Sequence, residues 1–227
     1  MTERARGHPN TAFAVASMGE PLSFSDTMVT STPDLNPIKA FVFCGQGPQH
    51  EHMGVHMYTR FAAFRNSVNA SFEMVAKFHK KNFQDEYGLF NPELNGKVAK
   101  TDKGDWKVEC IVIAITIFQI ALFDLWVDLG VQPDVVLGHS VGEIAAMYAS
   151  GALTHEKAIR TAIARSNALS LLDTIDGQMA ALGMSRQEAE QLIQRIMKEN
   201  GTDTGLWVSA SNSTNAVAVS GLSLIHI

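Results

Sequence analysis

The chain has few cysteines, no strong excess of charge of either sign and no apolar leader at its amino end. Its 227 residues include only Cys44 and Cys110, too few for a disulfide framework or a four-ligand zinc site. We therefore expect a reduced, cytoplasmic setting. The formal net charge of −5 lacks the basic balance of nucleic-acid-binding proteins. The first ten residues lack the apolar core of a secretory signal.

A long apolar run is also missing. The longest stretch runs from Cys110 to Leu122 and is interrupted by Thr116 and Gln119. It is shorter than the roughly 20 residues of a membrane-spanning helix, so we expect a buried helix and no membrane contact. The apolar fraction of 46% is that of an ordinary globular protein with a sizeable core.

The hydrophobic pattern divides the chain into four parts. Residues 1–38 show no sustained period, and we interpret them as a linker or the end of a preceding region. Residues 39–175 alternate strand and helix patterns. A buried strand is predicted at 39–44 and a second strand at 134–138. Helices are predicted at about 61–78, 106–129, 141–150 and 154–172. Gly130 fits the cap that ends the second helix.

The pattern changes after Gly177. A strand is predicted over Met179–Met184, followed by a capping box in which Ser185 and Glu188 bond each other's backbone amides. Two more strands follow the helix, the last at about Ala216–Ser220. The order strand–helix–strand–strand indicates part of a small α+β unit over residues 176–221, with an unpaired edge expected near Ala216–Ser220. Residues 222–227 are interpreted as a non-native tail.

The segment Gly138–Gly142 reads Gly-His-Ser-Val-Gly and lies between a strand pattern and a helix pattern. In this arrangement a strand turns sharply into a helix with Ser140 at the apex, and the flanking glycines allow the two elements to approach. The serine hydroxyl is then exposed beside the helix amino end, where the amide of Val141 can face an oxyanion. The pattern predicts a nucleophilic serine.

Five segments, in order, resemble the malonyl-CoA:acyl carrier protein acyltransferases, and in particular the acyltransferase domain of type I polyketide synthases. The first is the strand and loop Phe41–Gln49, and the central one is Gly138–Glu143. The others are Leu125-Trp126 with Gly130–Asp134, Gly151–Leu153 with Arg165-Ser166, and Gly177–Ala181 with Ser220-Gly221. The likeness covers about residues 39–221.

The resemblance implies an α/β fold: a hydrolase-like large subdomain with a parallel sheet and a serine elbow (39–175), and a partial ferredoxin-like small subdomain (176–221). It implies that Ser140 is acylated by malonyl-CoA and deacylated by the phosphopantetheine thiol of an acyl carrier protein. Gln46 and Val141 would supply the oxyanion-hole amides, and Arg165 would bind the malonyl carboxylate. His139 and Met179 would border the pocket. No bound cofactor or metal is expected, and flanking ketosynthase and other synthase domains are implied.

The match is incomplete, because the resemblance places the catalytic base in a histidine beyond the small subdomain. His139 is expected to point away from the hydroxyl, His155 has no supporting motif, and His226 lies in the unmatched tail. We therefore assign no base and expect a truncated domain. Val141 favours malonyl over methylmalonyl, because glutamine is typical after the serine in methylmalonyl-selecting domains.

Two other functions share the elbow. One is a serine hydrolase of the esterase or lipase kind, and the other is a catalytically incomplete docking fragment. Gln46 and Arg165 argue against a simple esterase, whereas the missing base favours the docking fragment. A metal site at His50, His52 and His56 is less favoured, because no carboxylate or cysteine joins them at ligand spacing.

Overall fold

The computed structural model describes residues 10–11, 29–30, 38–80, 88–90, 106–171, 177–200 and 205–222. Within the expected linker, β1 (Asn10–Thr11) pairs antiparallel with β2 (Val29–Thr30). Residues 91–105 between α2 and α4, and the tail with His226, lie outside the described residues.

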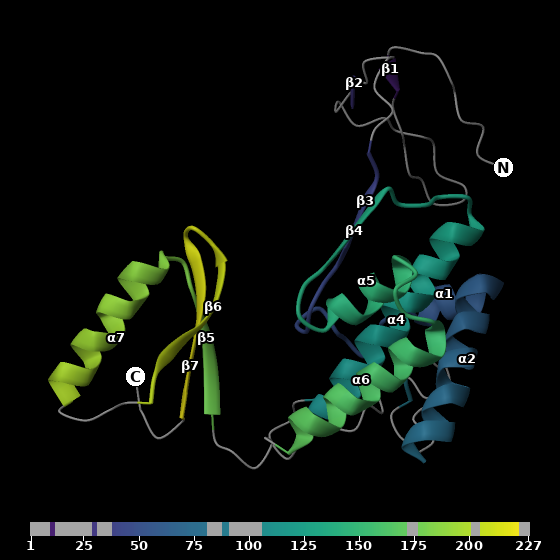
Figure 1. Ribbon diagram of the computed structural model, residues 1–227. Helices are drawn as coiled ribbons and strands as arrows, with labels where there is room; N and C mark the ends of the chain where they lie inside the picture. The colour runs from purple at the N-terminus through teal and green to yellow at the C-terminus, as the bar shows by residue number, and fades with distance from the viewer. Residues whose placement is uncertain are drawn as a thin grey trace.

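Five helices gather into one body (Figure 1). They are α1 (Val55–Arg60), α2 (Ala62–His79), α4 (Val108–Asp128), α5 (Gly142–Ala149) and α6 (His155–Ser170). The helices predicted from the apolar spacing are confirmed within a few residues. Gly130 adopts a positive φ of 78° and donates its amide to the carbonyl of Val127, which confirms the cap that ends α4.

Helix α4 is the centre of this body. It packs against α2, α5 and α6, and an 18-residue stretch of its 21 residues has a mean hydropathy of 2.3. The helix is thus long and apolar enough to cross a membrane, so the expectation from the shorter apolar run was wrong about length. Two thirds of that stretch are buried in the structure, and a helix covered in this way is the core helix of a folded domain.

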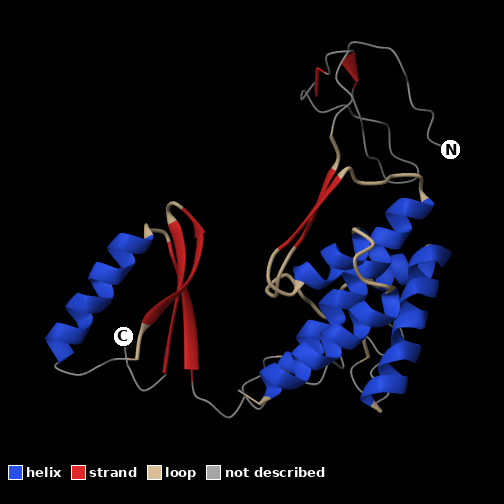
Figure 2. Cartoon of the chain, viewed as in Figure 1, coloured by secondary structure: helices blue, strands red, loops and turns tan. Residues whose placement is uncertain are grey.

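Strands β3 (Ala40–Phe43) and β4 (Val135–Gly138) form a parallel pair beside the helices (Figure 2). The prediction that residues 39–44 form a buried strand holds for one face only. Phe41 and Phe43 pack against Phe123 of α4, whereas Val42 and Leu137 on the other face are 65% and 55% exposed. Parallel sheets are normally covered on both faces, so this exposed apolar face is unusual.

The remaining residues form a second, smaller unit with its own core. Its elements are β5 (Gly177–Leu182), α7 (Arg186–Asn200), β6 (Trp207–Ser213) and β7 (Ala216–Leu222). Ala189 and Ile193 of α7 pack on Val217 and Val219 of β7. The predicted order and the capping box are confirmed: the Ser185 amide donates to Glu188 Oε2 at 2.8 Å, and the Glu188 amide donates to Ser185 Oγ at 3.3 Å.

The expected unpaired edge at Ala216–Ser220 was wrong. The strand order is β5-β7-β6, so β7 is the central strand and is paired on both sides. The unpaired edges of this sheet belong to β5 and β6. The two strands after α7 were predicted, but the pattern contained no information that β5 would pair with β7 rather than with β6.

We expect the isolated 227-residue chain to self-associate through the exposed face of β3 and β4, because an uncovered apolar strand pair is a template for association. A double variant, Val42→Lys with Leu137→Lys, should sediment as a monomer at concentrations where the parent associates. Val136→Lys is the control, because Val136 packs against the core and this change should lower Tm instead. A parent chain that is monomeric at all concentrations would contradict this expectation.

Candidate active site

The turn between β4 and α5 holds Ser140 in a conformation that serine rarely adopts. Its φ is +53°, a left-handed backbone that costs about 1–3 kcal/mol in a residue other than glycine. The amides of Gly142 and Glu143 close the turn by donating to the carbonyls of His139 and Ser140, at 2.9 and 3.2 Å. The predicted elbow is therefore present, with Ser140 at its apex.

The two glycines of the elbow are required by close backbone approach. A Cβ on Gly138 would lie 2.5 Å from the Cα of Glu143, and one on Gly142 would lie 2.6 Å from the carbonyl oxygen of Cys44. Real Cβ atoms essentially never come so close to backbone atoms. The start of α5 can therefore rest against the end of β3 only without side chains at these positions.

The loop after β3 lies against the elbow. A Cβ on Gly45 would be 3.2 Å from the Cβ of Ser140 and 3.0 Å from Nδ1 of His139. Gln46 is the next residue and is exposed. The loop that carries Gln46 is therefore beside the nucleophile, as an oxyanion-hole role requires. Val141 is almost fully buried and precedes the first residue of α5, where backbone amides have no partner within the helix.

Sequence reasoning gave no role to Gln119, which anchors this loop. Its Nε2 donates to the carbonyl oxygen of Cys44 at 2.7 Å, and only 8% of the residue is exposed. The signal was present, because Gln119 interrupts an otherwise apolar run. A lone amide in a core helix has to be hydrogen-bonded, and here its partner is the residue before the Gly45–Gln49 loop.

Arg165 is the residue that the structure brings to Ser140. It lies on α6, is half-buried, and donates from Nη2 to Ser140 Oγ at 3.1 Å. Among the described residues no carboxylate forms an ion pair with it. A half-buried guanidinium beside a nucleophile is a ready binding group for an anionic substrate.

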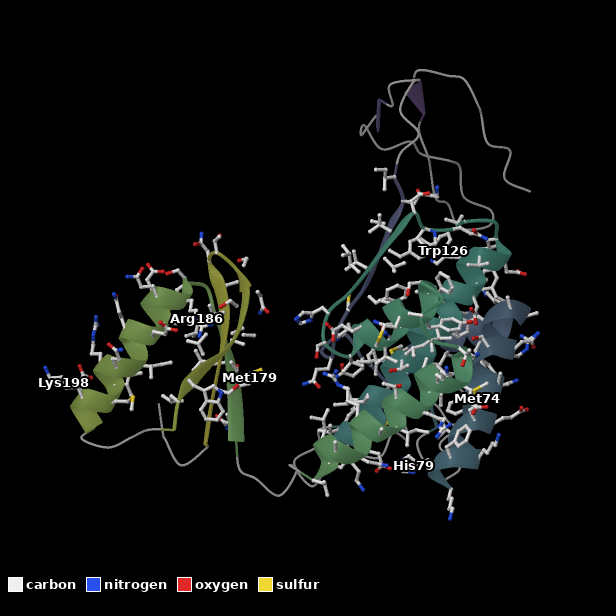
Figure 3. All side chains as sticks on the ribbon, viewed as in Figure 1. Met74, His79, Trp126, Met179, Arg186 and Lys198 are labelled. Carbon is white, nitrogen blue, oxygen red and sulfur yellow. The ribbon has the colours of Figure 1, made fainter. Side chains whose placement is uncertain are left out.

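The other predicted residues lie elsewhere. His139 is exposed, with its Nδ1 close to Gly45 rather than hydrogen-bonded to Ser140. Met179 lies on β5 and is 70% exposed (Figure 3), so its place at a pocket stays a prediction. His155 Nε2 is 2.7 Å from Ser71 Oγ. Within the described residues, no imidazole or carboxylate is hydrogen-bonded to Ser140, and no three potential metal ligands are grouped together.

A cavity of about 420 Å³ runs between β3 and α4 and does not include Ser140 or Arg165. Its walls are mostly apolar and include Phe41, Phe43, Leu122, Phe123 and Trp126. Trp126 lies at the end of α4 nearest these strands (Figure 3). The cavity is lined by β3, by α4 and by Pro48 and His50 of the loop after β3.

Residues 40–223 match the family model of the acyl transferase domain. The chain belongs to this family. The match begins at β3, includes the elbow and Arg165, and ends just after β7, so both units of the structure lie within it.

Curated relatives are fungal polyketide synthases. The chain is 35% identical over 190 residues to the highly reducing polyketide synthase stpks1 of Strobilurus tenacellus, covering 83% of this chain and 7% of that protein. It is 36% identical over 208 residues to curS1 of Aspergillus terreus, covering 89% of this chain and 8% of that protein. The chain thus spans less than a tenth of the length of these relatives.

Solved acyltransferases share the fold. The loading acyltransferase of the avermectin modular polyketide synthase matches with a TM-score of 0.64 and 29% identity, covering 81% of this chain and 54% of that one. The acyltransferase domain of PpsC from Mycobacterium tuberculosis matches with a TM-score of 0.65 and 26% identity, covering 82% and 50%. The chain therefore spans about half the length of these two solved acyltransferases.

The close approach at Gly142 leads to a stability prediction. We expect Gly142→Ala to lower the free energy of unfolding by about 1–3 kcal/mol, the usual range for overpacking, because the carbonyls of Phe43 and Cys44 cannot move without shifting β3. The matched control is Gly183→Ala, where a Cβ would meet nothing within 4 Å. Chemical denaturation measures both; equal effects would contradict the packing that we describe.

Proposed function

We propose that this acyltransferase domain chain transfers malonyl from CoA to the phosphopantetheine thiol of an acyl carrier protein within a polyketide synthase. The observation that carries the proposal is the 3.1 Å contact between Arg165 Nη2 and Ser140 Oγ at the elbow. In this contact the Arg165 guanidinium, which can bind a carboxylate, lies next to the Ser140 hydroxyl, which can attack a thioester. A solved relative named malonyl CoA-acyl carrier protein transacylase, from Coxiella burnetii, matches at 25% identity and a TM-score of 0.61.

The reaction would run in two acyl transfers. Ser140 Oγ attacks the thioester carbonyl of malonyl-CoA, the C–S bond breaks, and CoA leaves as the thiol with the serine proton. The carrier thiol then attacks the seryl ester and returns a proton to Ser140 Oγ. Gln46 and Val141 are proposed to stabilise the oxyanion in both steps through their backbone amides. No residue of this chain is assigned as the general base, which the resemblance places in a histidine beyond the small subdomain.

The distance between Arg165 and Ser140 favours malonyl among acyl groups. In a malonyl ester one methylene separates the free carboxylate from the ester carbonyl. A group that binds this carboxylate must therefore lie within a few ångströms of the serine oxygen, as Arg165 does. The same feature argues against simple ester hydrolysis, because a neutral ester offers Arg165 no partner. The valine at position 141, directly after Ser140, favours malonyl over methylmalonyl as the acyl group, because glutamine is typical at this position in methylmalonyl-selecting domains.

The finer architecture is part of this proposal. We infer that residues 39–175 are the hydrolase-like subdomain, with its serine elbow after a parallel strand, and residues 176–221 part of a ferredoxin-like subdomain. The order β5-β7-β6 with one helix on a single face supports the second assignment. We also propose a cytoplasmic setting, with ketosynthase and other synthase domains flanking this one and no bound cofactor.

Ser140 is expected to carry the acyl group. Incubating the acyltransferase domain that contains this chain with malonyl-CoA should add one malonyl group to the peptide with Ser140. Intact-mass and peptide mass spectrometry detect it, and Ser140→Ala should abolish it, because no other nucleophile lies at the elbow. Labelling that persists elsewhere in an active alanine variant would show that the nucleophile is misassigned.

Arg165 is expected to select acyl groups that carry a carboxylate. A hydrogen bond to a charged group contributes roughly 1.5–3 kcal/mol, and about 1.4 kcal/mol is tenfold. Arg165→Ala should therefore reduce kcat/KM for malonyl by about ten- to a hundredfold and for acetyl far less. Arg165→Lys should restore only part of the loss, because an ammonium does not reproduce the planar fork.

The measurement is the ratio of kcat/KM for malonyl to that for acetyl, compared among the parent and the two variants. A ratio that stays constant while both activities fall would make Arg165 a structural residue and would remove the main support for malonyl selection.

A further inference from the structure

A cluster of buried and half-buried polar side chains lies among the helices, away from Ser140. Asp124 Oδ2 accepts from Ser67 Oγ at 2.6 Å, and Oδ1 accepts from the hydroxyl of Tyr148 at 2.8 Å. Ser71 Oγ lies 2.7 Å from His155 Nε2, and the rings of His155 and Tyr148 are in contact, with centroids 5.4 Å apart. We call these five residues the Asp124 cluster.

The Asp124 cluster connects four helices through named bonds. Ser67 and Ser71 lie on α2, Asp124 on α4, Tyr148 on α5 and His155 on α6. Hydrogen bonds are directional, whereas the surrounding Ile and Val contacts tolerate sliding. The cluster therefore fixes the relative position of the helices more sharply than their apolar packing does.

The surroundings of the cluster shift the pKa values of Tyr148 and His155. Burial, followed by the hydrogen bond and charge of Asp124, raises the pKa of Tyr148, so this hydroxyl stays a donor. Burial also lowers the pKa of His155, although the Asp124 charge opposes the shift. The negative charge of Asp124 is thus held by two hydroxyl donors, and losing one leaves a poorly compensated carboxylate.

Two of the connected helices carry the reacting groups. Helix α5 begins just after Ser140 and bears Tyr148 in its last turn, whereas α6 begins at His155 and bears Arg165 farther along. At 1.5 Å per residue, Tyr148 lies about 12 Å along the chain direction from Ser140, and His155 about 15 Å from Arg165. A small rotation of α5 or α6 about the cluster would therefore displace Ser140 or Arg165 at the other end of the helix.

We propose that the Asp124 cluster is a positioning device that fixes α5 against α6 and so maintains the 3.1 Å contact between Ser140 Oγ and Arg165 Nη2. Tyr148 positions α5, which follows the nucleophile Ser140. The contact between His155 and Ser71 positions α6, which bears Arg165. The consequence for acyl selection rests on the proposed function, whereas the geometric claim does not.

The test compares Tyr148→Phe with a matched control, Tyr58→Phe. Both tyrosines are half-buried, and Tyr58 donates its hydroxyl to Asn69 Oδ1 at 2.8 Å between α1 and α2. Each variant loses one hydroxyl and one hydrogen bond. Because Tyr148 donates to a carboxylate and Tyr58 to a neutral amide, Tyr148→Phe should lower Tm more. Only Tyr148→Phe cuts a bond to the Asp124 cluster.

The first measurement needs no catalysis. In an ¹⁵N–¹H spectrum of the domain, the side-chain Nε–H resonance of Arg165, assigned through Arg165→Lys, should shift or broaden in Tyr148→Phe and remain in place in Tyr58→Phe. Ser71→Ala tests the arginine side and should also move this resonance. An Arg165 resonance unchanged in both Tyr148→Phe and Ser71→Ala would overturn the proposal.

The second measurement concerns selection. Because misplacing a reacting group by about 1 Å can reduce the rate up to a hundredfold, Tyr148→Phe should lower the malonyl-to-acetyl ratio of kcat/KM about three- to tenfold, with no change in Tyr58→Phe. Equal ratios in the two variants, measured at a temperature where both are fully folded, would overturn the link to selection. If the parent transfers no malonyl but the Arg165 resonance responds, the proposed function fails and the positioning role stands.

Discussion

The approach of the α5 backbone to the end of β3 is the constraint on which the site depends. Gly142 rests against the carbonyls of Phe43 and Cys44, and no side chain fits there. This contact makes the turn after β4 so tight that Ser140 has a positive φ. It also brings the Gly45–Gln49 loop beside the serine. One backbone contact thus determines the position of the nucleophile and of the loop proposed to bind the oxyanion.

Helix α4 supplies the frame for this contact. Most of its residues are apolar and buried, and two of its polar side chains bind specific partners: Gln119 holds the carbonyl of Cys44, and Asp124 holds Tyr148 of α5. Polar groups inside a core are costly unless bonded, and when bonded they specify one arrangement. Gln119 therefore orients the Gly45–Gln49 loop and Asp124 orients α5, which lie on either side of Ser140. The apolar residues of α4 provide the stability.

Much of this could be predicted from the sequence, because the signals are local. The apolar spacing predicted the helices, the Gly-His-Ser-Val-Gly pattern predicted the elbow, and Ser185 with Glu188 predicted the capping box. What failed was non-local. The central place of β7, the exposed face of Val42 and Leu137, and the partner of Gln119 depend on which segments meet in space. Residues 39–44 predict a buried strand because apolar residues lie on both of its faces. The sequence of the strand does not show whether other segments cover both faces.

The contact between Arg165 and Ser140 is compatible with substrate binding because a guanidinium has more than one donor. It offers five N–H groups in a planar fork, and the bond to Ser140 Oγ uses one of them. Because Oγ accepts this bond, its own proton is free to go to a base, and the arginine charge favours the oxygen as it becomes negative. The remaining donors can bind the carboxylate one methylene from the ester carbonyl. A lysine has one compact charge and would have to share it between Ser140 Oγ and the malonyl carboxylate. The arginine fork can bind both groups at once, as the proposed transfer requires.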